Sequence, residues 1–173
     1  MRLYLIRHGA AVDAAGFRGP DASRPLTAEG RCELTKLFKR MRRKETPPVA
    51  IWASPLVRAV QTAELCAFLW GDRVDVDVSL SLVPEAPTPE VLAEIAKSRP
   101  DSPLALVGHE PFLSTLLVQL TGSREGLSLP KASITRVRFR PDETPAGRFA
   151  RLHAPKLEQP ILDLEKLYQR QDH

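Results

Sequence analysis

The sequence predicts an α/β fold of three layers (α/β/α), with helices on both faces of a mostly parallel sheet. Two short apolar runs, at residues 3–6 and 104–107, are typical of strands that are buried on both faces. Segments whose apolar residues recur with helical spacing alternate with such strands, which favours parallel pairing. Two strand-like segments near the end, at 134–139 and 148–152, predict an antiparallel pair at one edge of the sheet.

The first two helices are predicted from their caps and apolar spacing. Thr27 is expected to cap a helix that ends before Pro47, because apolar residues recur every three or four positions after it. A strand is expected at 49–53. Ser54 and Pro55 then predict the N-cap and the first position of a helix that runs to about residue 70.

The middle of the chain continues the alternation. Valines alternate with aspartates at 74–78, which predicts a half-exposed strand near an edge of the sheet. Further helices are expected at 88–98 and from residue 111 to the glycine at 122.

Length and composition place the chain among single-domain globular proteins. It has 173 residues, of which 43% are hydrophobic and 27% charged. We expect one domain at 1–161 and a C-terminal tail or short helix at 162–173. No apolar run reaches the ~18–20 residues of a membrane helix, and the run at 3–6 is too short for a signal peptide. The chain is therefore expected in the cytoplasm, with no membrane partner.

The two cysteines indicate a reducing compartment. Cys32 and Cys66 lie within predicted helices and form no CxxC pair. We interpret both as reduced residues of the core, and no disulfide framework is expected.

The charge balance favours an anionic substrate over a nucleic acid. The net charge of +4 arises from 25 basic and 21 acidic residues spread along the chain, without the concentrated basic surface of a DNA-binding protein. The densest basic cluster, at 36–44, lies at the end of a predicted helix, where cations suit the helix dipole. Arg136, Arg138 and Arg140 are interpreted as a solvated strand face or as a surface for an acidic partner.

Two of the four histidines occupy matching places in the predicted sheet. His8 follows the strand at 3–6, and His109 follows the strand at 104–107 after one glycine. Because ligands of open α/β sheets bind at the carboxyl ends of the strands, both side chains are expected in one crevice. His153 and His173 have no accompanying motif and are interpreted as structural or exposed.

Three arginines accompany these histidines. Arg7 precedes His8, Arg58 lies in the first turn of a predicted helix, and Arg24 lies in the long loop before Thr27. Arginine matches phosphate oxygens with two parallel hydrogen bonds, so the set predicts a cationic pocket for a phosphoryl group. No spacing typical of a metal site or of a nucleotide loop is present, and neither a metal nor a cofactor is expected.

The motifs around these residues resemble the histidine phosphatase (phosphoglycerate mutase-like) superfamily, and most of all its SixA-type phosphohistidine phosphatases. The resemblance spans about residues 2–155 and has four parts in the family's order. These parts are Arg7-His8-Gly9, Arg24-Pro25-Leu26-Thr27 with Gly30, Ser54-Pro55 with Arg58, and Gly108-His109-Glu110-Pro111. The resemblance implies the phosphoglycerate mutase-like fold and a hydrolase that needs no metal.

The resemblance also implies the roles of the site residues. His8 is expected to attack phosphorus and form a covalent phosphohistidine, which water then hydrolyses. Arg7, Arg58 and His109 are expected to hold the phosphoryl oxygens and stabilise the charge in transfer, and Arg24 is expected to line the same pocket. Gly9 is expected to let the backbone turn tightly beside the phosphate.

The general acid is left open by the sequence. Glu85 is the candidate in the place where many members carry a carboxylate, and its alternative interpretation is an exposed loop residue. A phosphohistidine substrate needs less help, because a protonated imidazole is a good leaving group. Glu110 is a candidate for orienting His109, without a role in proton transfer.

Three functions are therefore weighed from the sequence. The first is removal of phosphate from phosphohistidine in a protein, and the second is hydrolysis of a small phosphate ester. The third is a non-catalytic module that binds a phosphorylated ligand. The presence of His8 favours an enzyme.

Overall fold

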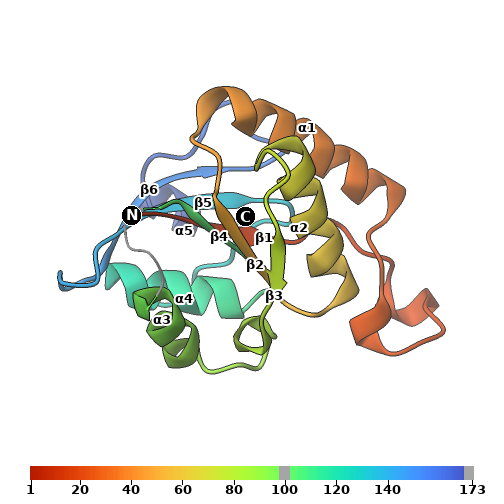
Figure 1. Ribbon diagram of the computed structural model, residues 1–173, viewed down its shortest axis with the longest axis horizontal. Helices are drawn as coiled ribbons and strands as arrows, with labels where there is room; N and C mark the ends of the chain where they lie inside the picture. Colours follow the sequence, from red (N-terminus) through yellow and green to blue (C-terminus); the bar gives the residue numbers. More distant parts are fainter. Residues whose placement is uncertain (98–101, 170–173) are drawn as a thin grey trace.

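Six strands form a single sheet in the order β3-β2-β4-β1-β5-β6 (Figure 1). The computed structural model describes residues 1–97 and 102–169. The strands are β1 Arg2–Arg7, β2 Ala50–Ala53, β3 Val76–Val78, β4 Leu104–Gly108, β5 Ile134–Phe139 and β6 Gly147–His153. The first four run parallel, whereas β5 pairs antiparallel with β1 and with the edge strand β6. The predicted mostly parallel sheet with an antiparallel edge pair is confirmed.

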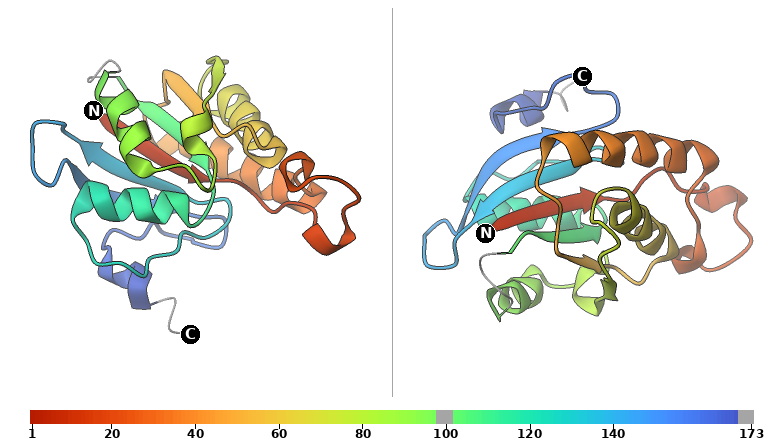
Figure 2. Two further views of the ribbon diagram at one scale, coloured as in Figure 1. Left: turned by 90° about the horizontal axis from the view of Figure 1, so that it is seen from below. Right: turned by 45° about the horizontal axis from the view of Figure 1, so that its top comes forward.

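Helices cover both faces of this sheet, which completes the three layers (Figures 1 and 2). One face carries α1 Ala28–Lys44 and α2 Val57–Leu69, and the other carries α3 Thr88–Lys97, α4 Phe112–Thr121 and α5 Glu165–Gln169. Each face has its own apolar cluster. The central strands β1 and β4 contribute alternate residues to both clusters, which explains their continuous apolar sequences. The predicted fold class is confirmed.

The start of α1 follows its predicted cap. The hydroxyl of Thr27 accepts a hydrogen bond from the backbone N–H of Gly30 at 3.0 Å. The buried face of α1 carries the apolar residues that were expected from the spacing, including Leu34 and Phe38. This cap fixes where the long loop at 9–26 ends and where α1 begins.

The start of α2 differs from the prediction. The helix begins at Val57 with Leu56 as its N-cap, and no side chain caps it. Ser54 instead continues the sheet, because its N–H donates to the carbonyl of Val107 at 3.0 Å. Its buried hydroxyl contacts His109 at 2.8 Å and therefore serves the site at the strand ends.

The prediction for the two cysteines is only half right. Cys66 is fully buried in α2, and burial raises the pKa of its thiol. Cys32 is exposed. It precedes Leu34 by two positions, about 200° around the helix, and therefore lies opposite the buried face of α1.

Arg136 is not part of a solvated strand face. Its guanidinium binds the carboxylate of Glu45 at 2.8 Å, and Glu45 follows α1 with a side chain that is only 2% exposed. Arg151 and His153 contact the same carboxylate at 3.4 Å each. Only Arg138 and Arg140 are exposed as predicted. This buried cluster joins the end of α1 to β5 and β6, which confirms the structural interpretation of His153.

Part of the expected tail packs on the domain as the short helix α5. Ile161 pairs with Leu152 of β6, and α5 then buries Leu167 and Tyr168 in the apolar cluster beneath α4. His173 and the expected end of the third helix at Ser98 lie outside the described residues. Within the described residues, no helix is both long and apolar enough to cross a membrane.

Gly30 lets α1 approach the chain just after His8. A β-carbon at position 30 would lie 2.3 Å from the carbonyl oxygen and 2.8 Å from the nitrogen of Ala10, and backbone atoms cannot rotate away. We expect Gly30→Ala to lower the free energy of unfolding by about 1–3 kcal/mol, as overpacking typically does. Urea denaturation measures this change.

Gly16→Ala is the matched control, because a β-carbon at position 16 meets no atom within 4 Å. We expect the control to change the free energy of unfolding by less than about 0.5 kcal/mol. Equal effects of the two substitutions would contradict the role assigned to Gly30.

Candidate active site

The two strand-end histidines lie side by side because β1 and β4 are neighbours in the sheet. Arg7 pairs with Gly108 in the parallel register, and the N–H of His8 donates to the carbonyl of Gly108 at 3.1 Å. The imidazole rings of His8 and His109 have centroids 5.0 Å apart and planes inclined by 56°. The prediction that both histidines share one crevice is confirmed.

The hydrogen bond of His8 fixes its tautomer. Nδ1 lies 2.7 Å from the carbonyl oxygen of Gly9, and a carbonyl only accepts, so Nδ1 carries the proton. The lone pair of the neutral ring is therefore on Nε2. This is the atom that a nucleophilic histidine needs to have free.

Burial keeps both rings neutral. The pKa of His8 is lowered from 6.5 to about 4, mainly by burial and in smaller part by the nearby Arg58 and Arg7. The pKa of His109 is lowered to about 3, mainly by burial and then by His8 and Arg58. At neutral pH the two rings can therefore stand together without charge repulsion.

Arg7 and Arg58 bring positive charge to the same crevice. Arg58 lies in the first turn of α2 and is only 6% exposed. Arg7 ends β1, and its guanidinium donates to the carbonyl of Leu129; burial lowers its pKa. The Nε atoms of both arginines are buried and have no hydrogen-bond partner among the described residues.

Asp21 joins Arg58 to Arg24. The carboxylate of Asp21 lies 3.0 Å from Nη2 of Arg58 and accepts from Nε of Arg24 at 2.7 Å. The hydrogen bonds from Arg24 and Arg58 lower the pKa of this carboxyl. Sequence reasoning missed Asp21, although its place three residues before Arg24 in the same long loop was an available signal.

These side chains surround a polar pocket of about 370 Å³. Its lining includes every titratable side chain that the sequence placed near the site, namely Arg7, His8, Arg24, Arg58, Glu85, His109 and Glu110. Asp21 and Lys131 also line it. Lys131 was also missed. It belongs to a loop that is tied to the site by the N–H of Ala132, which donates to the carbonyl of His8 at 3.1 Å. Only this tertiary contact brings Lys131 to the pocket, so the sequence carried no local signal for it.

Ser54, rather than Glu110, contacts the ring of His109. Nε2 of His109 lies 2.8 Å from the Ser54 hydroxyl, while Nδ1 has no partner among the described residues. Glu110 lines the pocket and interacts with Arg7, and burial raises the pKa of its carboxyl. The structure therefore does not support the idea that Glu110 orients His109.

Gly9 does not line the pocket. A β-carbon there would lie 2.7 Å from Cδ1 of Leu34, so the glycine is needed for packing against α1. Its backbone is not left-handed, so the close approach to α1 is what distinguishes a glycine at this position. Within 1–97 and 102–169, no three or more His, Cys, Asp or Glu side chains are grouped to hold a metal ion.

Comparison with known proteins assigns the family. Residues 3–81 match the model of the histidine phosphatase superfamily (branch 1). An uncharacterised protein of Picosynechococcus is 35% identical over 143 residues, which cover 80% of this chain and 85% of that protein. The chain belongs to the histidine phosphatase superfamily.

Solved structures share the fold. The protein histidine phosphatase SixA complexed with tungstate superposes with a TM-score of 0.77 at 24% identity, covering 90% of this chain and 97% of that one. Phosphoserine phosphatase of Entamoeba histolytica, in complex with phosphoserine, gives a TM-score of 0.69 at 15% identity, covering 90% and 98%. The chain has the phosphoglycerate mutase-like fold and resembles the SixA-type members.

The depressed histidine pKa values can be tested directly. We expect the ring resonances of His8 and His109 to titrate near pH 4 and pH 3, because burial opposes the charged form. NMR titration of the ring Cε1–H signals measures both, with His8→Ala and His109→Ala used for assignment. Either midpoint near the ordinary value of 6.5 would contradict the neutral pair.

Proposed function

We propose that the chain is a phosphatase that works through a covalent phosphohistidine at His8 and removes phosphate from phosphohistidine in a protein. The observation that carries this proposal is the neutral ring of His8, with a free Nε2, beside a pocket lined by Arg7, Arg24 and Arg58. A ready nucleophile and clustered cations are what phosphoryl transfer requires.

The proposed reaction consists of two successive phosphoryl transfers. Nε2 of His8 attacks phosphorus, the new P–N bond forms, and the P–N bond to the substrate imidazole breaks. The leaving imidazole takes its electron pair and a proton from solvent. Water then attacks the phosphorus on His8 and returns the electron pair to Nε2, which releases inorganic phosphate.

The remaining residues stabilise charge in this scheme. Arg7 and Arg58 line the pocket, and their guanidinium cations suit phosphoryl oxygens. His109 supplies its ring at 5.0 Å from that of His8. Positioned arginines account for factors of about 10³–10⁵ in the rate of phosphoryl transfer.

Two observations bear on the substrate. The overall likeness to SixA supports phosphohistidine, although at 24% identity it is a likeness of fold. Glu85, in contrast, is exposed and lines the pocket, where it suits protonation of an alkoxide leaving group. A small phosphate ester is therefore the second candidate, and a site that binds phosphate without turnover is the third.

A paired rate assay in EDTA tests the proposed reaction. We expect fast loss of phosphate from a phosphohistidine-bearing protein domain and slow cleavage of an aryl phosphate, because imidazole leaves readily once it is protonated. His8→Ala is expected to abolish both reactions, since it removes the nucleophile. Turnover by His8→Ala would rule out the covalent mechanism, and tight phosphate binding without turnover by the native chain would favour the third candidate.

Glu85→Gln separates the two enzymatic candidates. If the carboxyl protonates an alkoxide, its loss costs about 10²–10⁴ in rate for phosphoserine and far less for phosphohistidine. We expect the ratio of the two kcat/KM values to change at least tenfold in favour of phosphohistidine. Glu90→Gln, at an exposed position in the first turn of α3, is the control. Equal slowing of both substrates would deny Glu85 a role as general acid.

A further inference from the structure

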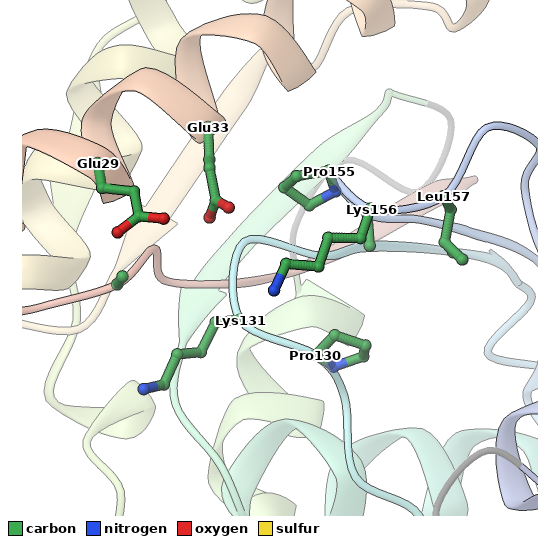
Figure 3. A pocket seen from close by; sticks show the side chains of 9 residues that line it. Glu29, Glu33, Pro130, Lys131, Pro155, Lys156 and Leu157 are labelled. Carbon is green, nitrogen blue, oxygen red and sulfur yellow. The ribbon is translucent and has the colours of Figure 1, made fainter.

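A second hollow adjoins the phosphate pocket. It has a volume of about 450 Å³ and lies between the first turns of α1 and two loops that carry Pro130 and Pro155 (Figure 3). Lys131 lines both hollows. Ala10 lines the second hollow, and its neighbour Ala11 lines the phosphate pocket. The two hollows are therefore parts of one depression that opens beside His8.

The depression continues along α1 as a groove. A third hollow, of about 330 Å³, shares Glu33, Pro155 and Lys156 with the second and extends to Arg40. From Glu29 to Arg40 the helix advances by ~16 Å at 1.5 Å per residue. This is about the length of five residues of extended polypeptide.

The far wall of the groove is held in place. Arg40 donates from Nη1 to the carbonyl of Leu157 and from Nη2 to the carbonyl of Ala154, both at 2.9 Å. The N–H of Leu157 also donates to the carbonyl of Ala154 at 3.1 Å. The groove is therefore formed before any ligand arrives, which reduces the entropy lost on binding.

Charges of opposite sign face each other across the groove. The carboxylates of Glu29 and Glu33 point into it from α1, and the amine of Lys156 points toward them from one loop, while Lys131 lines it from the other loop (Figure 3). None of these four side chains forms an ion pair with another residue in the described part of the chain. A ligand in the groove can therefore pair with charges that the protein leaves available.

We propose that this groove binds the polypeptide segment next to the phosphohistidine of the substrate protein, with a basic side chain of that segment against Glu29 and Glu33. The inference rests on the proposed function and states how the chain would recognise the polypeptide of its substrate protein. A small phosphate ester fills only the pocket around His8 and leaves the groove empty. A polypeptide fills both, because the groove leads directly away from His8 and has the length of several residues.

Charge-swapped peptides test the proposal by binding. Two phosphohistidine peptides of equal length are compared, one flanked on both sides by lysines and the other by glutamates. Kd is measured with His8→Ala chains, so that the peptides are not consumed. We expect Glu29→Lys combined with Glu33→Lys to lower the preference for the lysine peptide about tenfold, as two charge reversals at solvent-accessible positions would. This change in peptide preference is expected to become smaller at high salt, because salt screens exposed charges.

Glu64→Lys combined with Glu90→Lys is the matched control, because it makes the same two charge reversals at exposed positions of α2 and α3 that line none of the three hollows. We expect it to leave the peptide preference unchanged. The same preference in the double variant, or an equal shift in the control, would overturn the proposal.

Hydrolysis by the chain with His8 intact is measured separately. Peptides that bind with the expected preference but are not hydrolysed would refute the proposed function alone. Peptides that are hydrolysed without a change of preference would refute the groove alone.

Discussion

The parallel pairing of β1 with β4 is the constraint on which the site depends. It aligns the carboxyl ends of two central strands, so that His8 and His109 leave the sheet at the same level with ring centroids 5.0 Å apart. Both strands are covered by helices on either face, which fixes their register. The position of His8, the proposed nucleophile, is thereby set by the core rather than by a flexible loop.

Electrostatics then decide the chemistry of these rings. Burial among arginines makes a charged histidine unfavourable, so both rings stay neutral and the Nε2 lone pair of His8 is available. The cations are in turn held by protein oxygens: Arg7 by the carbonyl of Leu129, and Arg58 by Asp21. The cationic pocket thus has part of its positive charge balanced by oxygens of the protein itself.

Much of this arrangement could be predicted from residue pattern. Continuous apolar runs identified the central strands, and a histidine after each run identified the crevice. Two of the errors are instructive because each involves a residue whose partner is distant in sequence. Ser54 had the local features of a helix cap, but its hydroxyl meets His109, 55 residues away. Arg136 looked solvated, but it pairs with Glu45, 91 residues away.

The sequence by itself determined the order of strands and helices, the two histidines at strand ends and the arginines near them, because these follow from local periodicity and from the geometry of parallel sheets. The tertiary structure alone decided that Asp21 bridges two arginines, that Lys131 joins the pocket, and that a groove runs along α1. Such features depend on how loops fold back onto the sheet. Contacts between segments far apart in the chain leave no periodic signal in the sequence.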